Sequence, residues 1–161
     1  MRSLSLLEAA AGVAVVGSLL AVGVPAFVRN LHASRLVEAM DGLAQISRSA
    51  AALAASQPDQ PSYPESAGLT PSVVPAGIAV RDPPGTWDQP TWRSLQFGFS
   101  TAHRYAFEFD SERRSHRARY KASARGDLDG DGQLSEFSIQ GEVSAGKAPL
   151  TFPVEMRREI E

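Results

Sequence analysis

Three aspartates in the C-terminal part of the chain have the type and spacing of calcium ligands. The segment is Asp127-Leu-Asp-Gly-Asp-Gly-Gln-Leu-Ser-Glu. Asp127, Asp129 and Asp131 place oxygens at positions 1, 3 and 5 of a calcium-binding loop, and Gly132 follows at the sharp turn. Gln133 adds its backbone carbonyl at position 7. Neighbouring carboxylates repel one another and a cation would relieve this, so the pattern predicts weak Ca²⁺ binding of the kind seen in extracellular modules.

The calcium pattern is incomplete beyond this point. Position 12 is Ser138 in place of the bidentate glutamate, and Glu136 at position 10 is the available substitute. The flanking sequence predicts no helices, so the loop is not an EF-hand. An Asp-Gly-rich hairpin loop between two strands would have the same composition. A calcium loop and a structural turn therefore both remain open.

Other chemistry has little support in the sequence. His32, His103 and His116 fall on different expected elements, there is no cysteine, and no nucleophile elbow or glycine-rich phosphate loop is present. We therefore expect no enzymatic activity. The 161 residues suit one domain, and 16 Lys+Arg against 18 Asp+Glu exclude a chain-wide nucleic-acid footprint.

The N-terminus carries a long uncharged segment. Residues 9–28 are twenty consecutive residues without a charge, and a helix of that length reaches about 30 Å, the thickness of a bilayer's hydrocarbon core. This predicts a single membrane span, with Arg2 in front of it favouring a C-terminal domain on the far side. Glu8 stands at the start of the segment, where a carboxylate is costly and usually paired.

Four residues here share a characteristic spacing. Counted from Leu4, a glutamate stands at the fifth position (Glu8), a glycine nine residues later (Gly17) and a proline eight residues after that (Pro25). This resembles the N-terminal segment of type IV pilins and of the related pseudopilins of type II secretion. The resemblance covers about the first 55 residues.

The resemblance implies a processing step and an assembly role. Prepilin peptidase would cut between Ser3 and Leu4, where the family usually has glycine before the cut, and the new amine of Leu4 would be methylated. Glu8 would neutralise that amine on an adjacent subunit and so set the register, while Gly17 and Pro25 would be weak points of the helix. The implied partners are copies of this chain or sibling pilins in a helical filament, the prepilin peptidase, the inner-membrane assembly platform and the membrane itself.

The helix is expected to continue from Leu4 to about Ser56. Its second half has an apolar stripe at steps of three or four residues, which predicts a face packed on a sheet: Leu36, Met40, Leu43, Ile46, Ala50 and Leu53. Eight of the eleven prolines then lie in residues 57–92, which predicts an exposed loop. Trp87 and Trp92 are expected to attach that loop to the core.

The C-terminal part alternates apolar and polar residues. This periodicity predicts antiparallel strands over 105–109, 117–125 and 136–143, with further strands at 95–99 and 148–154. The expected fold class is α+β and pilin-like, with a long N-terminal helix, membrane-spanning in its first half, packed on a C-terminal antiparallel sheet. The expected segments are a leader (1–3), a transmembrane half-helix (4–28), an amphipathic half-helix (29–56), a proline-rich loop (57–92) and a sheet domain (93–161).

Basic residues gather on and before one expected strand: Arg113, Arg114, His116, Arg117, Arg119, Lys121 and Arg125. Glutamates on the neighbouring strands (Glu108, Glu136 and Glu142) are expected to pair with them across the sheet. This favours a solvated face over nucleic-acid binding.

The sequence as a whole favours a structural subunit of a type IV pilus or a similar filament, anchored in the inner membrane before assembly and polymerised through its N-terminal helix. The C-terminal domain would be periplasmic before assembly and extracellular in the filament. A pseudopilin of a type II secretion system is the close alternative. A non-polymerising, membrane-tethered module that binds calcium or another ligand is the alternative from another class.

Overall fold

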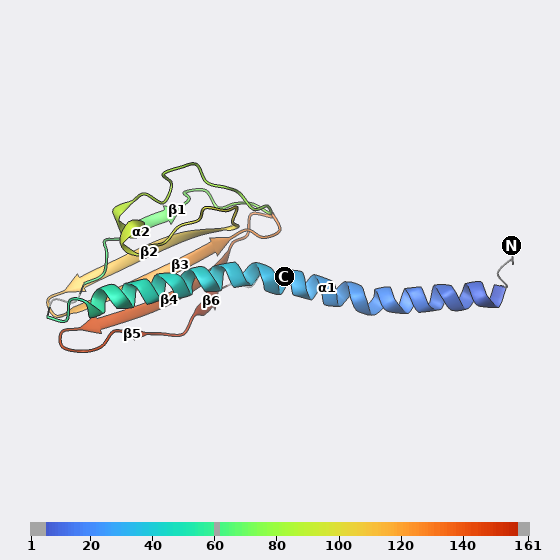
Figure 1. Ribbon diagram of the computed structural model, residues 1–161, viewed down its shortest axis with the longest axis horizontal. Coiled ribbons are helices and arrows are strands. Elements are labelled where there is room, and N and C mark those ends of the chain that lie inside the picture. The colour runs from blue at the N-terminus through green and yellow to red at the C-terminus, as the bar shows by residue number, and fades with distance from the viewer. Residues whose placement is uncertain (1–5, 60–61, 158–161) are drawn as a thin grey trace. The chain divides into compact units, whose positions relative to one another are not determined.

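The computed structural model describes residues 6–59 and 62–157 of the chain, and within the N-terminal half of the first helix it describes the side chains of residues 10 and 14–24. The chain divides into two compact units, Met1–Leu36 and Val37–Glu161. The first unit, as far as it is described, consists of helix. The second contains the remainder of that helix and a β-sheet (Figure 1).

Helix α1 extends from Leu6 to Ala55. Its last turn ends in Ser56, whose N–H donates to the carbonyl of Ala52 at 3.1 Å and whose hydroxyl donates to the carbonyl of Leu53 at 2.7 Å. Gln57 precedes Pro58, and a residue before proline is disfavoured in the helical conformation. The helix therefore ends where the sequence predicted.

One face of α1 in the second unit is fully buried. Its core side chains follow the three- and four-residue spacing: Ala39, Leu43, Ile46, Ala50 and Ala54 are all 0% exposed. The predicted stripe was wrong at Met40, which is 40% exposed. Small residues occupy this face because the sheet comes close: a Cβ on Gly42 would lie 2.6 Å from the ring of Phe107.

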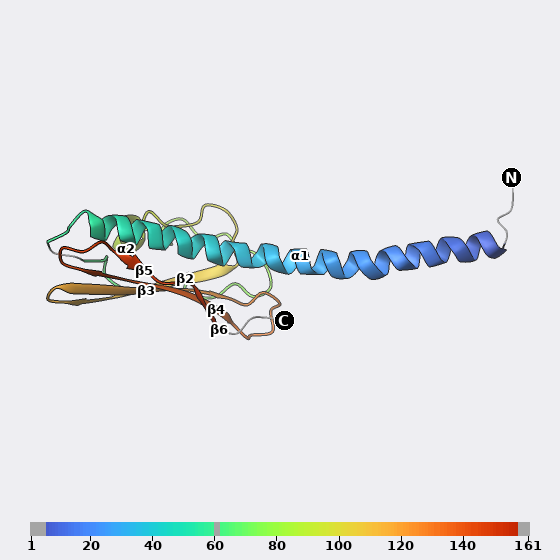
Figure 2. The ribbon, with the colours of Figure 1, turned by 90° about the horizontal axis from the view of Figure 1, so that it is seen from below.

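The sheet has six strands, and its named pairs are all antiparallel. The strand order is β1-β2-β3-β4-β5, and β6 also pairs with β4. The bounds are Ala67–Thr70 (β1), Tyr105–Arg114 (β2), Arg117–Gly126 (β3), Ser135–Ser144 (β4), Leu150–Thr151 (β5) and Glu155–Arg157 (β6). The part of α1 from Val37 onward covers one face of this sheet (Figure 2).

Strands β3 and β4 lie close to their predicted positions. Strand β2 begins where predicted, at Tyr105, and continues beyond the predicted 105–109 to Arg114, with its first half buried and its second half largely exposed. The strand predicted at 95–99 was wrong. Leu95 is the C-cap of the short helix α2 (Pro90–Ser94), and Gln96 has a φ of 50°, in the left-handed region that interrupts a strand. A strand was also predicted at 148–154, and within this range Leu150 and Thr151 form strand β5.

The proline-rich loop is attached to the core by aromatic rings. Trp92 is fully buried in α2, and Trp87 packs edge-on against it with ring centroids 5.4 Å apart. Trp87 also contacts Phe97, at 5.4 Å, and Phe107 of β2, at 6.4 Å. The prediction that both tryptophans attach the loop is confirmed.

The expected fold class is contradicted at its membrane-spanning half. In the stretches 6–59 and 62–157, no helix has both the length and the apolar character needed to cross a bilayer. The prediction rested on residues 9–28, an apolar stretch of twenty residues without a charge that is about as long as a bilayer's hydrocarbon core is thick. The observed architecture is α1 together with an antiparallel six-stranded sheet.

The predicted localisation in the inner membrane is contradicted for the same reason. A single-pass anchor in the inner membrane, with a periplasmic C-terminal domain, requires a helix of the kind that the described part of the chain lacks.

Candidate functional site

The three predicted calcium ligands lie together in the loop between β3 and β4. One carboxylate oxygen from each of Asp127, Asp129 and Asp131 lies within 4.8 Å of the others. Asp127 is 5% exposed, whereas Asp129 and Asp131 are exposed. The β3–β4 connection therefore concentrates negative charge at one end of the sheet.

Hydrogen bonds within the loop account for its shape. The Asp127 carboxylate accepts from the backbone N–H of Gly130 at 2.8 Å and of Gly132 at 3.1 Å. Asp131 accepts from the backbone N–H of Gln133 at 2.7 Å and from its side-chain amide at 2.9 Å. The backbone hydrogen bond from Gln133 is the main cause that holds the pKa of the Asp131 carboxyl below its ordinary value.

The remaining predicted ligands do not complete a calcium shell. Glu136, the expected substitute, lies in β4 and forms an ion pair with Lys121 at 3.4 Å. The side-chain amide of Gln133 donates to Asp131, a contact that does not involve the backbone carbonyl predicted as the ligand at position 7. Among the residues described, the acidic group consists of the three aspartates alone, so Ca²⁺ binding stays a prediction from the sequence.

The predicted assembly residues lie in the first unit. Ser3 and Leu4 fall outside the described residues. Glu8 and Pro25 are part of α1, and their side chains are not described. At Gly17 a Cβ would meet no heavy atom within 4 Å, so no packing within the described chain requires a glycine there.

An exposed apolar segment of α1 surrounds Gly17. Every residue from 14 to 24 is exposed. The large apolar side chains among them are 53–73% exposed: Val15, Val16, Leu19, Leu20, Val22 and Val24. Soluble monomers rarely leave so many adjacent apolar side chains uncovered, and such a surface marks an interaction site.

The basic strip on β3 is largely paired, as predicted. Arg117 and Arg119 both donate to the Glu142 carboxylate of β4. Arg125 lies 2.9 Å from Glu108 of β2. The hydrogen bond from Arg117 is the main cause that holds the pKa of Glu142 below its ordinary value.

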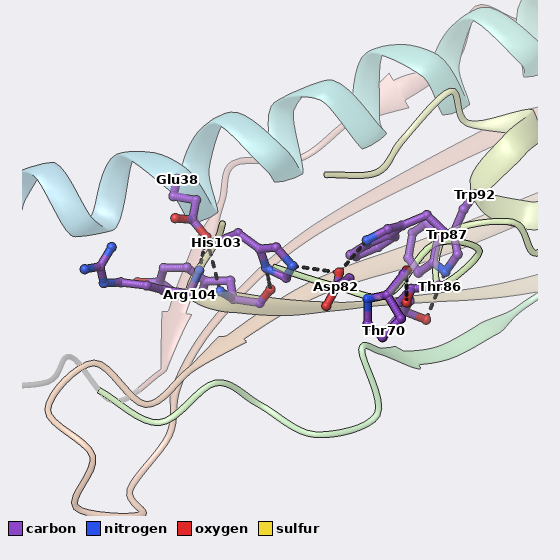
Figure 3. Close-up of polar contacts among 10 residues, drawn as sticks. Glu38, Thr70, Asp82, Thr86, Trp87, Trp92, His103 and Arg104 are labelled. Atoms are coloured by element: carbon purple, nitrogen blue, oxygen red, sulfur yellow. Dashed lines mark hydrogen bonds and ion pairs between the residues drawn. The ribbon is translucent and has the colours of Figure 1, made fainter. Parts of the chain in front are cut away.

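A buried polar cluster that the sequence did not indicate joins the proline-rich loop to the start of β2 (Figure 3). The side chain of His103 is 1% exposed, and its Nε2 lies 2.7 Å from Oδ2 of Asp82, whose side chain is 5% exposed. The indole N–H of Trp87 donates to the same oxygen at 2.7 Å. Nδ1 of His103 lies 2.8 Å from the carbonyl oxygen of Tyr105.

This geometry defines where one of the protons is. The Tyr105 carbonyl can only accept, so Nδ1 of His103 must carry a hydrogen. Nε2 is hydrogen-bonded to Oδ2 of Asp82, and the same oxygen accepts from the indole N–H of Trp87. The Asp82 carboxyl group therefore connects the two rings in the interior.

Glu38 of α1 lies beside this cluster (Figure 3). Its Oε1 accepts from the backbone N–H of Arg104 at 2.7 Å and of Tyr105 at 3.1 Å. The sequence contains no motif for these contacts, because they join positions 21 and 66 residues apart. Through these contacts the cluster attaches α1, the proline-rich loop and the start of β2 to one another.

Comparison of the chain with protein-family models, with curated proteins and with solved structures finds no match.

Proposed function

We propose that this protein is a structural subunit of a filament of the type IV pilin class, assembled through its N-terminal helix. The observation that supports this most strongly is the exposed apolar segment of α1 from residue 14 to residue 24. It lies between the two pilin-like positions Glu8 and Pro25.

The apolar segment favours several neighbours over one. At about 100° per residue, its six large side chains cover an arc of roughly 200° around the helix. A single partner helix covers one stripe, whereas the centre of a helical filament would surround the whole arc. Burial of each Val or Leu stabilises an assembly by about 1.5–3 kcal/mol before the costs of association.

The small residues of the same segment support close helix packing. Gly17 and Gly23 each face open space in the described chain. Glycines at a helix surface allow neighbouring backbones to approach closely. Their presence among exposed valines and leucines is therefore explained by contact with another helix.

Glu8 gives the assembly its register in this proposal. A carboxylate enclosed by apolar helices is strongly disfavoured unless it is paired. The amine of Leu4 in an adjacent subunit would pair with it, which explains why a charged residue stands immediately before the apolar stretch. A pseudopilin of a secretion system would use the same residues in the same way.

The test is Glu8→Gln in cells that produce the filament. We expect filament yield in the sheared fraction to fall at least tenfold while the amount of cellular protein stays similar. Glu65→Gln, a change at an exposed residue just before β1, is the matched control and should leave the yield unchanged. Equal yields from the two variants would contradict the proposal and favour the non-polymerising module.

A further inference from the structure

The two ends of strand β3 carry opposite charge. Its N-terminal end follows the β2–β3 turn, and its C-terminal end leads into the aspartate loop, so the two charged groups lie at opposite ends of the sheet (Figure 1). The basic end consists of exposed residues around that turn: Arg113, Arg114, His116, Arg117 and Arg119. We call this group the basic tip.

Ion pairs neutralise the basic tip only in part. Arg114 lies 2.6 Å from Glu112, and Glu142 serves both Arg117 and Arg119. Four arginines against these two glutamates leave a net charge of +2 with His116 neutral. Within the described residues, Arg113 has no ion-pair partner, and Arg114 is 79% exposed.

The acidic end is not neutralised within its loop. Residues 127–134 contain three aspartates and no basic residue. Asp129 and Asp131 are exposed. The aspartate loop is therefore a compact, negatively charged group at the end of β3 opposite the basic tip.

The two ends cannot neutralise each other inside one chain. Strand β3 has ten residues, which span about 30 Å. The Debye length at physiological ionic strength is about 8 Å, so each end is electrostatically independent of the other. Each end is available to a partner.

We infer that the basic tip of one copy binds the aspartate loop, Asp127–Asp131, of the next copy. This inference rests on the proposed function and names a contact between neighbouring subunits. The contact joins different surfaces of the two copies, so it repeats along a line without closing into a dimer. That is the type of interface a filament requires.

Charge complementarity favours the aspartate loop of a second copy as the group that binds to the basic tip. Arginine forms paired hydrogen bonds with discrete carboxylates, and the loop offers two exposed carboxylates. A nucleic acid would meet Glu112 and Glu142 among the arginines, and like charges at an interface are unfavourable. The mixture of arginine and glutamate at the tip therefore fits a small acidic loop better than a continuous phosphate backbone.

The chain has no native cysteine, so a designed pair reports on this contact alone. Arg114→Cys and Asp129→Cys are introduced together into the full-length protein in filament-producing cells, and a short thiol-specific cross-linker is added. Each copy can then be cross-linked to one neighbour through its tip cysteine and to another through its loop cysteine. We therefore expect a ladder of dimers, trimers and larger species on a denaturing gel. Each single-cysteine variant is a control and should stop at dimers or monomers.

Charge reversal provides a second, independent readout. Arg113→Glu with Arg114→Glu makes both ends negative, and Asp129→Lys with Asp131→Lys makes both ends positive. Each variant alone should lose most of its filaments, because like ends repel. Co-expression of the two variants should restore filaments, since each negative tip then meets a positive loop, whereas a variant that had simply failed to fold would not be rescued.

The outcomes separate the two proposals. Filaments without a ladder and without rescue would overturn the charged contact and leave the subunit assignment intact. A ladder in cells without filaments would support the contact and contradict the filament. If the tip variant alone lost function and the loop variant behaved as wild type, the tip would have a different anionic partner and the inference would be wrong.

Discussion

His103 and Asp82 form a buried hydrogen bond, with Nε2 and Oδ2 2.7 Å apart and side chains 1% and 5% exposed. His103 lies just before β2, and Asp82 lies in the proline-rich loop. The backbone groups of Val80 and His103 also pair with each other, which joins the same loop to the segment just before β2. Together these contacts hold the loop on the domain.

Asp82→Asn should destabilise the domain strongly. The change alters a buried side chain that accepts from the indole N–H of Trp87 and is hydrogen-bonded to Nε2 of His103, and a buried polar group left without its partner costs about 1–3 kcal/mol. Asp88→Asn is the matched control, because Asp88 and its partner Arg93 are each 67% exposed and an exposed pair contributes at most about 1 kcal/mol. Urea unfolding measures both variants, and equal effects would contradict a stabilising role for the buried contact.

Tyr63 should limit stability at alkaline pH. Burial, followed by the nearby Tyr120 and Glu142, raises the pKa of the Tyr63 phenol far above its ordinary value. A raised pKa in the folded state means that the folded chain keeps a proton that the unfolded chain loses. Stability is therefore intact below about pH 10, the ordinary tyrosine pKa, and falls as the pH rises beyond it.

Tyr63→Phe tests this directly. The Tyr63 hydroxyl has no hydrogen-bond partner among the described residues, so its removal should change stability at pH 7 by less than about 0.5 kcal/mol. Thermal melts between pH 8 and pH 11 should show a smaller alkaline loss for the variant than for the wild-type protein. An identical pH dependence would show that Tyr63 is not the responsible group.

Gly42→Ala should disrupt the contact between helix and sheet. The new Cβ would lie 2.6 Å from the Phe107 ring, and Phe107 is fully buried with little room to move. Overpacking costs about 1–3 kcal/mol and exceeds the gain of up to about 1 kcal/mol from the higher helix propensity of alanine. Gly68→Ala, where a Cβ meets no atom within 4 Å, is the control and should be milder in the same unfolding assay.

Gly17→Ala should separate folding from assembly. No heavy atom lies within 4 Å of the added Cβ, and alanine favours the helix, so the isolated subunit should be no less stable. A methyl group on the assembly face should nevertheless hold neighbouring helices apart and reduce filament yield several-fold. Normal yield would show that Gly17 is not at a contact between helices.

The sequence predicted those parts of the fold that depend on local periodicity. The apolar spacing around Leu43 and Ile46 identified the packed part of α1. The alternation in β3 and β4 put Arg119 and Glu142 on the same face, and the register of the two strands in the structure sets them opposite each other. The strand predicted at 95–99 failed because the left-handed conformation of Gln96 is not visible in an apolar pattern. The membrane span, predicted from a long apolar stretch without charges, is contradicted, because the described residues contain no helix that is long and apolar enough to cross a bilayer.

The candidate sites were predictable to different degrees. The grouping of Asp127, Asp129 and Asp131 follows from their sequence proximity, because a tight turn brings alternate residues together. The His103–Asp82 pair was not predictable. Asp82 lies in a long, irregular loop, and no local sequence pattern indicates which part of the sheet domain that loop will contact. The exposure of residues 14–24 became clear from the structure, which showed that nothing in the described chain covers them.

The measurement that tests the central claim most directly is mass spectrometry of filaments sheared from producing cells. The account predicts that this chain is a component of the sheared fraction and that its N-terminal peptide starts at a methylated Leu4. Absence of the chain from purified filaments, together with cellular protein that still starts at Met1, would contradict the subunit assignment.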